Sequence, residues 1–215
     1  MSLTETDRRF VLAVDIDDVL CDTMPAFLDF TNKKFNLDIG PADYNDDWVK
    51  MWGLESAEAA EPYIEEWTKI EQLGIFAPVA GSQEAIAELS SHPKVDIVLP
   101  TSRRTALEKV THAWTRRHYG EAAFKGIHFA GFYAPNVNGH DGTKGALYTE
   151  LGANAAVDDH TKHIRAAVGV ASMNLPMLYG TNSWTLRDGV PEGAIHAPQW
   201  SDVTQQVISY LDQAV

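Results

Sequence analysis

The sequence contains five short apolar runs, and segments with helical character separate most of them. The runs are FVLAVDI from Phe10, VDIVLPTS from Val95, GIHFAG from Gly126, NAAVDD from Asn154 and LPMLYG from Leu175. Near-continuous apolar runs are typical of strands that are buried on both faces, as the strands of parallel sheets are. Because strands that alternate with helices favour an open α/β sheet, the sequence predicts an α/β fold of this kind.

Four segments between and after these runs are predicted to be helices. They are SQEAIAELSS from Ser82, TALEKVTHAWTRRHY from Thr105, KGALYTELG from Lys144 and SDVTQQVISYLDQ from Ser201. Gly120 and Gly152 stand at the ends of the second and third segments, where glycine is favoured because it accepts left-handed backbone angles. Ser201 is expected to cap the last helix with its side chain.

The segment between Asp22 and Phe76 interrupts the alternation, because no convincing strand occurs in it. PAFLDFTNKKFNL and SAEAAEPYIEEWTKIEQLG have amphipathic helical patterns, and Pro62 predicts a kink or a restart in the second. Open α/β sheets bind ligands at the carboxyl ends of their strands, so we expect this helical insert to lie there as a cap. The expected division is a core domain of residues 1–21 and 78–215 and a small helical cap domain of residues 22–77.

The charge and the cysteine content limit the classes of partner and compartment. A formal net charge of −13 argues against a nucleic-acid polymer or an anionic membrane surface as the main partner. A small anionic substrate stays possible, because local cations or a metal ion govern the field inside one cleft. The single cysteine, Cys21, forms no intramolecular disulfide, which favours a reducing compartment. The N-terminal MSLTETDRRF has no apolar core of a signal peptide and no run is long enough to span a bilayer, so we expect a cytoplasmic protein.

Three acidic residues follow the first predicted strand, at Asp15, Asp17 and Asp18. Residues i and i+2 of a strand point to the same side, so Asp15 and Asp17 are expected to project together. One carboxylate of such a pair can stay ionised while the other carries a proton, and a cation such as Mg²⁺ relieves their repulsion. The alternative is an Asp-rich turn, since aspartate is common in turns and helix caps.

Polar residues at the ends of other predicted strands change this balance. VDIVLP is followed by Thr101, Ser102 and Arg103, and NAAV is followed by Asp158 and Asp159. Lys144 begins the helix before that last strand. The carboxyl ends of parallel strands meet at one edge of a sheet, so all these residues are expected to gather there. Their combination favours a catalytic site over a simple turn.

The same residues resemble the motifs of the haloacid dehalogenase-like (HAD) hydrolases. DIDDV at 15–19 matches the first motif DxDx[TV], and IVLPT ends in the second-motif residue Thr101. Lys144 matches the third motif, and AAVDD at Asp158 and Asp159 matches the fourth. Within this superfamily, the position of the cap and the segments PTSRRTALEKVTHAWTRRHYG and TKGALYTELGANAAVDDHTKHI are similar to the 5′(3′)-deoxyribonucleotidase-like branch. The resemblance implies a Rossmann-like open parallel sheet, a HAD-like core, with a small helical cap inserted after the first strand.

The resemblance also implies an activity, the Mg²⁺-dependent hydrolysis of a phosphomonoester through an aspartyl-phosphate. Asp15 would be the nucleophile, and Asp17 would donate a proton to the leaving alcohol and later take one from water. Thr101 would hydrogen-bond a phosphoryl oxygen. Lys144 would neutralise the charge of the phosphoryl group and hold Asp15.

Further residues are expected to bind the metal ion and the substrate. Asp159 would be a direct Mg²⁺ ligand together with Asp15 and the backbone carbonyl of Asp17, and Asp158 would hold a metal-bound water or share the ligation. Ser102 and Arg103 are candidate phosphate contacts, although a solvated first helical turn is the alternative for Arg103. His160 and His163 have a spacing that some metal sites use, but a loop and first helical turn is favoured because imidazole suits softer metals.

The cap is expected to select the leaving group of the substrate. Trp48 matches the place where the deoxyribonucleotidase branch presents aromatic side chains to a base, whereas Trp52 and Trp67 are expected to form the core of the cap. The first hypothesis is a nucleoside monophosphate as substrate. The alternatives are another small phosphoester, such as a sugar phosphate, and a non-catalytic phosphate-binding regulatory protein. The sequence leaves a monomer and a homodimer equally open.

Overall fold

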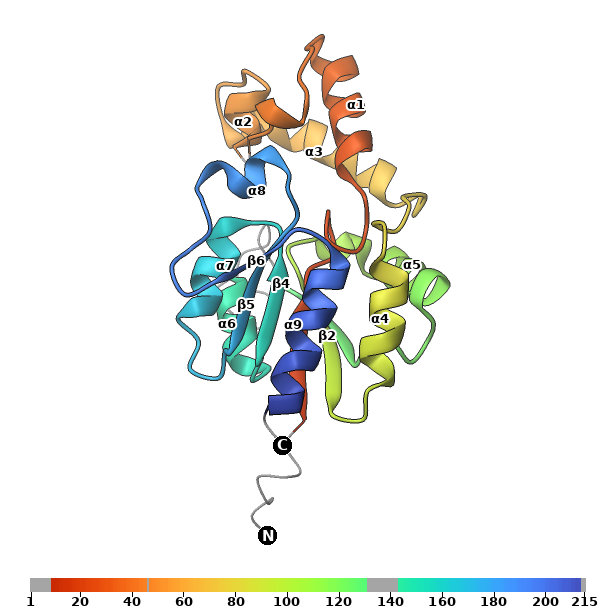
Figure 1. Cartoon of the computed structure of the whole chain (residues 1–215). Coiled ribbons are helices and arrows are strands. Elements are labelled where there is room, and N and C mark those ends of the chain that lie inside the picture. Colours follow the sequence, from red (N-terminus) through yellow and green to blue (C-terminus); the bar gives the residue numbers. More distant parts are fainter. Residues whose placement is uncertain (1–8, 46, 131–142, 214–215) are drawn as a thin grey trace.

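Six parallel strands form one open sheet in the order β3-β2-β1-β4-β5-β6 (Figure 1). The strands are β1 (Phe10–Val14), β2 (Val95–Thr101), β3 (Gly126–Phe129), β4 (Ala155–Asp158), β5 (Leu175–Tyr179) and β6 (Ile195–Ala197). This computed structural model describes residues 9–45, 47–130 and 143–213, so most of the N-terminal segment considered for a signal peptide lies outside the described residues. All five adjacent pairs are parallel, which confirms the predicted α/β fold with an open parallel sheet. β6 was not predicted, because its three residues are too few to form a recognisable apolar run.

Helices cover both faces of this sheet (Figure 1). α4 (Ser82–Ser91), α5 (Glu108–Tyr119) and α9 (Trp200–Gln213) share one apolar cluster, and α6 (Lys144–Glu150) and α7 (Thr161–Val168) share the other. β1 contributes to both clusters by the alternation of its side chains, with Leu12 and Val14 in the first and Ala13 in the second. The strand is therefore buried on both sides, as its continuous apolar run predicted.

The predicted helices are confirmed with small differences at their ends. A short 3₁₀ turn, η3 (Thr105–Leu107), precedes α5. The predicted capping role of Ser201 is wrong, because α9 begins at Trp200 and Ser201 lies inside its first turn. The side chain of Asp202 accepts the backbone N–H of Gln199 there instead.

The segment after β1 is a helical insert. It contains α1 (Met24–Phe35), η2 (Pro41–Asp43), α2 (Trp48–Met51) and α3 (Ala57–Glu71), which lie beyond the end of the sheet near α8 (Ser183–Arg187) (Figure 1). α3 runs through Pro62 without interruption, so the predicted restart is wrong. Phe27, Trp52 and Trp67 pack ring to ring in the centre of the insert. Within the described ranges, no helix combines the length and the apolar character needed to cross a membrane.

The strand order reverses direction between β1 and β4, which are neighbours in the middle of the sheet. Chain segments leave this point toward opposite sides, which opens a crevice at the carboxyl ends of the two strands. Asp15 directly follows β1, and Asp158 ends β4. The fold therefore brings two of the predicted acidic positions to the place where open α/β sheets bind ligands.

Asp18 connects the core to the insert by capping α1. Its backbone has a φ of 57°, in the left-handed region that aspartate tolerates better than most residues. Its Oδ1 accepts the backbone N–H groups of Thr23 at 3.0 Å and Met24 at 2.9 Å, at the start of α1. The helix has no side-chain cap from Thr23 itself. Asp18, which the sequence left without a role, therefore satisfies two donors of the first turn of α1.

Replacement of Asp18 by Ala is expected to destabilise the protein by about 1–3 kcal/mol, because it removes this cap and because alanine tolerates the left-handed region less well than aspartate. The matched variant Asp18→Asn keeps an acceptor oxygen and tolerates the same backbone angles, so its loss is expected to be much smaller. Denaturant unfolding of the two variants measures the difference. Equal stabilities would show that the cap contributes nothing.

Candidate active site

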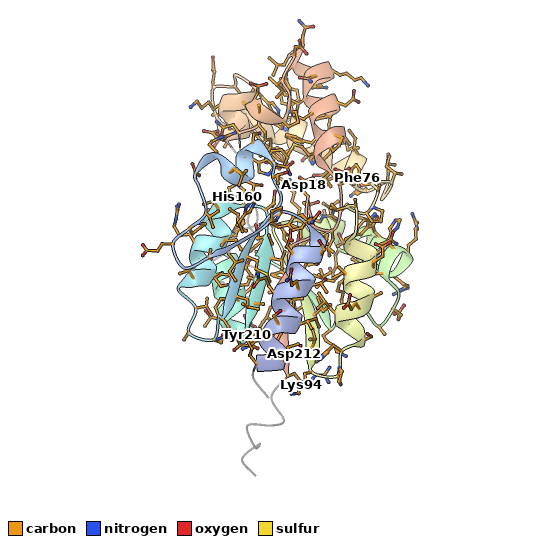
Figure 2. All side chains as sticks on the ribbon, in the orientation of Figure 1. Asp18, Phe76, Lys94, His160, Tyr210 and Asp212 are labelled. Carbon is orange, nitrogen blue, oxygen red and sulfur yellow. The ribbon has the colours of Figure 1, made fainter. Side chains whose placement is uncertain are left out.

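A cleft lies between the helical insert and the end of the core that carries the strand carboxyl ends. Figure 2 shows Asp18 and His160 at that end of the core, beneath the insert, and Lys94, Tyr210 and Asp212 at the opposite end. Both the core and the insert line the cleft. The core side includes Asp15, Asp17, Ser102, Arg103, Lys144 and Asp159, and the insert side includes Phe27, Tyr44, Trp48, Ile64, Trp67 and Glu71. The volume of about 240 Å³ suits a small molecule.

Lys144 lies between two carboxylates at the floor of this cleft. Its Nζ is 2.7 Å from Asp15 Oδ1 and 2.7 Å from Asp158 Oδ2, and all three side chains are buried. Asp15 Oδ1 also accepts the backbone N–H of Ile16 at 2.7 Å. Burial raises the pKa of Asp15 to about 7, although Lys144 opposes the shift. Burial alone would lower the pKa of Lys144, but its two carboxylate partners outweigh burial and raise it, so Lys144 stays charged.

The two adjacent acidic residues at the end of β4 have different surroundings. Asp158 is fully buried and also accepts the Tyr148 hydroxyl and the backbone N–H of His160. Burial alone would raise its pKa, but Lys144, His163 and the hydrogen bonds that Asp158 accepts from Lys144 and the His160 N–H together outweigh burial and lower it. Asp159 lines the cleft and accepts the indole N–H of Trp184 at 2.7 Å. Burial, followed by repulsion from Asp158, raises the pKa of Asp159 well above its usual value.

These carboxylates have the arrangement of a candidate metal centre. One oxygen from each of Asp15, Asp158 and Asp159 lies within 4.8 Å of the others, and all three residues are buried. Buried carboxylates that repel one another are stabilised by a bound cation, and an all-oxygen donor set suits a hard divalent ion such as Mg²⁺. The residues present therefore fit the expected ion. Among the residues that the structure describes, no histidine takes part in such a group.

Asp17 and Arg103 form a paired contact at the side of the cleft. Arg103 Nη2 lies 2.7 Å from Asp17 Oδ1, and its Nε lies 3.0 Å from Oδ2 and 3.2 Å from Oδ1. Arg103 is 8% exposed. The structure thus places both residues at the predicted site, where Arg103 contacts the carboxylate of Asp17.

The two hydroxyl residues that follow each other at the end of β2 differ in their contacts. Thr101 is fully buried, and its Oγ1 accepts the backbone N–H of Arg103 at 3.2 Å. Ser102 lines the cleft, and its buried Oγ has no hydrogen-bond partner among the described residues. A buried hydroxyl without a partner is costly, so a ligand oxygen would stabilise it.

The aromatic residues of the insert divide between its core and the cleft. Trp52 and Trp67 are 5% and 4% exposed, and Trp67 reaches the cleft as well. Trp48 is partly exposed, lines the cleft and packs on Phe27 with ring centroids 4.7 Å apart. Trp48 is therefore placed where it can contact a ligand and also supports the insert.

Trp184 and Glu71 line the cleft, and the sequence assigned a role to neither of them. Trp184 on α8 follows β5, at the carboxyl edge of the sheet where the strand-end rule places ligand-binding residues. Glu71, at the end of α3, reaches the cleft only through the folding of the insert onto the core, so no local signal identifies it. Burial, followed by repulsion from Asp17, raises the pKa of Glu71 to about 8.

Comparison with known proteins gives one family match and many structural matches. A family model described as 5′ nucleotidase, deoxy (Pyrimidine), cytosolic type C protein matches residues 9–131, more than half of the chain. No curated protein matches the chain significantly.

Solved structures with low sequence identity share the fold over nearly their whole length. A predicted phosphatase from Clostridium acetobutylicum has a TM-score of 0.66 at 12% identity, with 94% of this chain and 100% of that chain covered. A predicted phosphoglycolate phosphatase from Haemophilus somnus 129pt has a TM-score of 0.62 at 16% identity, with 93% and 98% covered. A HAD-superfamily hydrolase of subfamily IA from Geobacter sulfurreducens PCA has a TM-score of 0.56 at 14% identity, with 92% and 99% covered. At these identities the likeness shows the fold alone, and it confirms the expected HAD-like fold.

Proposed function

Because the chain belongs to the 5′ nucleotidase, deoxy (Pyrimidine), cytosolic type C protein family, we propose that it is a Mg²⁺-dependent nucleotidase that hydrolyses nucleoside monophosphates. The observation that carries this proposal is the buried Asp15, which faces the cleft and is held by Lys144 at 2.7 Å. A carboxylate so placed is suited to attack phosphorus, because its charge partner fixes it and it is itself buried.

In the first step, an oxygen of Asp15 forms a bond to phosphorus as the ester bond to the alcohol breaks. Lys144 and the Ile16 N–H both contact Asp15 Oδ1, so we assign the attack to Oδ2. Asp17 donates a proton to the departing alcohol. In the second step, water attacks the aspartyl-phosphate, Asp17 takes up its proton, and Asp15 is released with inorganic phosphate.

The phosphoryl group is proposed to lie over Lys144 and beside the hydroxyl residues of β2. Ser102 has the unpartnered hydroxyl that a phosphoryl oxygen would satisfy. Thr101, which the family resemblance implicates, is fully buried, and its Oγ1 accepts the Arg103 N–H, which leaves its O–H to donate to a phosphoryl oxygen. The sequence also led us to expect that Arg103 contacts the phosphate group of the substrate.

The metal ion is proposed to bind Asp15, Asp159 and the backbone carbonyl of Asp17, with Asp158 holding a water or sharing the ligation. When bound, Mg²⁺ would neutralise charge on the phosphoryl oxygens. Trp184 holds Asp159 through its indole N–H and so orients this ligand. Asp158 already accepts from Lys144, Tyr148 and the His160 N–H, which favours its indirect role.

The cap is proposed to be residues 22–77, on a core of residues 1–21 and 78–215, and to recognise the leaving group. Trp48 at the cleft is the candidate for stacking on a nucleobase, which is worth about 1–3 kcal/mol per base. A sugar phosphate or another small phosphoester is the alternative substrate, and a non-catalytic regulatory protein is the third hypothesis. The family description names a cytosolic type, which supports the proposed cytoplasmic location.

A substrate panel tests this function. Purified protein is expected to release inorganic phosphate from nucleoside 5′- or 3′-monophosphates with Mg²⁺, and to lose this activity in EDTA. p-Nitrophenyl phosphate and several sugar phosphates complete the panel. Turnover of a sugar phosphate with none of any nucleotide would replace the nucleotidase proposal by the alternative, and no turnover of any ester with Mg²⁺ would refute catalysis.

A further inference from the structure

The guanidinium of Arg103 is held from two sides. Its Nε and Nη2 contact both oxygens of Asp17, and its Nη1 donates to Thr111 Oγ1 at 3.2 Å. Thr111 lies on α5 and is fully buried. The side chain of Arg103 is 6% exposed, whereas that of Asp17 is 32% exposed. A fixed and buried cation therefore holds a carboxylate that would otherwise be free to rotate toward water.

The geometry of this pair restrains Asp17 more than a single contact would. A guanidinium that contacts both oxygens of a carboxylate fixes its plane as well as its position. Thr111 anchors the opposite side of the same guanidinium, so the restraint passes from α5 through Arg103 to Asp17. Asp17 is the residue whose position matters for proton transfer, because a general acid must lie within hydrogen-bond reach of the leaving oxygen.

We propose that Arg103 is the positioning residue for Asp17, and that it acts in proton transfer to the leaving group and not in phosphate binding. This role rests on the proposed function and deepens it. Asp17 Oδ1 accepts two contacts from Arg103 and Oδ2 accepts one. Oδ2 therefore keeps the capacity to carry the proton to the alcohol and to take one from water. Arg103 itself neither gives nor takes a proton.

The role predicts an effect that depends on the leaving group. An alkyl oxygen leaves as a strong base and needs a proton from Asp17, whereas p-nitrophenolate leaves without one. The ratio kcat/KM covers the steps up to release of the alcohol, so it isolates the acid step from the later attack of water. A residue that only positions Asp17 therefore affects kcat/KM for alkyl phosphates and spares that for aryl phosphates.

The variant Arg103→Met is expected to lower kcat/KM for the nucleoside monophosphate that the wild type turns over best by about 100-fold. The same ratio for p-nitrophenyl phosphate is expected to fall less than about threefold, and inhibition by inorganic phosphate is expected to stay unchanged. Arg104→Met is the matched control, because Arg104 is the next residue, lines the same cleft and pairs with Glu61 at 2.8 Å. We define the substrate ratio as kcat/KM for the nucleoside monophosphate divided by kcat/KM for p-nitrophenyl phosphate. Arg104→Met is expected to keep the wild-type substrate ratio.

Two further variants keep the test decisive if Arg103→Met does not fold. Thr111→Val removes only the anchoring oxygen and is expected to shift the substrate ratio in the same direction, by a few-fold. In the Asp17→Asn background, Arg103→Lys is expected to change the substrate ratio no further, because the residue on which Arg103 acts is already lost.

Equal losses on both substrates, with weaker inhibition by phosphate, would overturn the inference and assign Arg103 to the phosphate. A further shift of the ratio in the Asp17→Asn background would overturn it as well. A wild-type protein that turns over neither ester with Mg²⁺ would refute the proposed function, and this role with it.

Discussion

Replacement of Asp15 by Asn is expected to lower kcat for every phosphomonoester by more than about 10³-fold, because the amide cannot form the phosphoryl-enzyme bond. The fold is expected to persist. Asn has the shape of Asp, its oxygen can still accept the Ile16 N–H, and Lys144 keeps its contact with Asp158. Initial-rate assays with saturating Mg²⁺, together with circular dichroism, measure both properties.

Asp22→Asn is the matched control for this variant. Asp22 belongs to the same acidic segment but is exposed and does not line the cleft. The same chemical change at that position is expected to leave kcat within about twofold of the wild type. An Asp15→Asn protein with wild-type activity would remove Asp15 from the mechanism.

Replacement of Lys144 by Met is expected to destabilise the protein by about 3–5 kcal/mol, because two buried carboxylates lose their common charge partner. Lys144 is 1% exposed and contacts Asp15 and Asp158 at 2.7 Å each. Met fills a similar volume, so the loss is electrostatic and not a loss of packing. Urea unfolding in EDTA measures it, since a bound cation would otherwise mask the repulsion. A second substitution, Asp158→Asn, is expected to restore part of the stability.

The loss caused by Lys144→Met is expected to grow with pH. Without the lysine, burial and mutual repulsion raise the folded-state pKa values of Asp15 and Asp158 above those of the unfolded chain. Both groups are protonated in both states below about pH 4, so the loss is small there. Stability falls as the pH rises through the interval between the unfolded and folded pKa values, which makes the loss greater at pH 8 than at pH 5.

Lys125→Met provides the control for this stability measurement. Lys125 lies 3.8 Å from Asp96, and its side chain is 58% exposed. Its replacement is expected to change the free energy of unfolding by less than about 0.5 kcal/mol at either pH. A Lys144→Met protein as stable as this control would show that the lysine does not hold the buried carboxylates together.

The sequence predicted the sheet and the place of the site because both depend on local pattern. Apolar runs identified five strands. Because parallel strands end at one edge of the sheet, the sequence placed Asp15, Thr101 and Asp158 together at that edge. β6 was missed, because IHA carries too few residues to show a pattern. Ser201 was misassigned since the helix begins one residue earlier, at Trp200.

The contacts within the site depend on distances that no local pattern contains. Arg103 was expected at the phosphate, and its contact with Asp17 joins two segments that are 86 residues apart. Trp184 holds Asp159 from a short helix that has no strong periodicity of its own. Asp18 had no assigned role because its function as a cap for α1 requires a left-handed backbone, which the sequence does not display.

The covalent role of Asp15 is tested most directly by trapping the phosphorylated enzyme. The protein is mixed with Mg²⁺ and an excess of its best substrate, quenched in acid during steady-state turnover, digested and examined by mass spectrometry. The expected result is an acid-stable, base-labile phosphoryl group on the peptide that contains Asp15, with Asp15→Asn as the control that lacks it. Steady turnover in which no phosphoryl group is found on that peptide, or in which it is found on another residue, would contradict the mechanism.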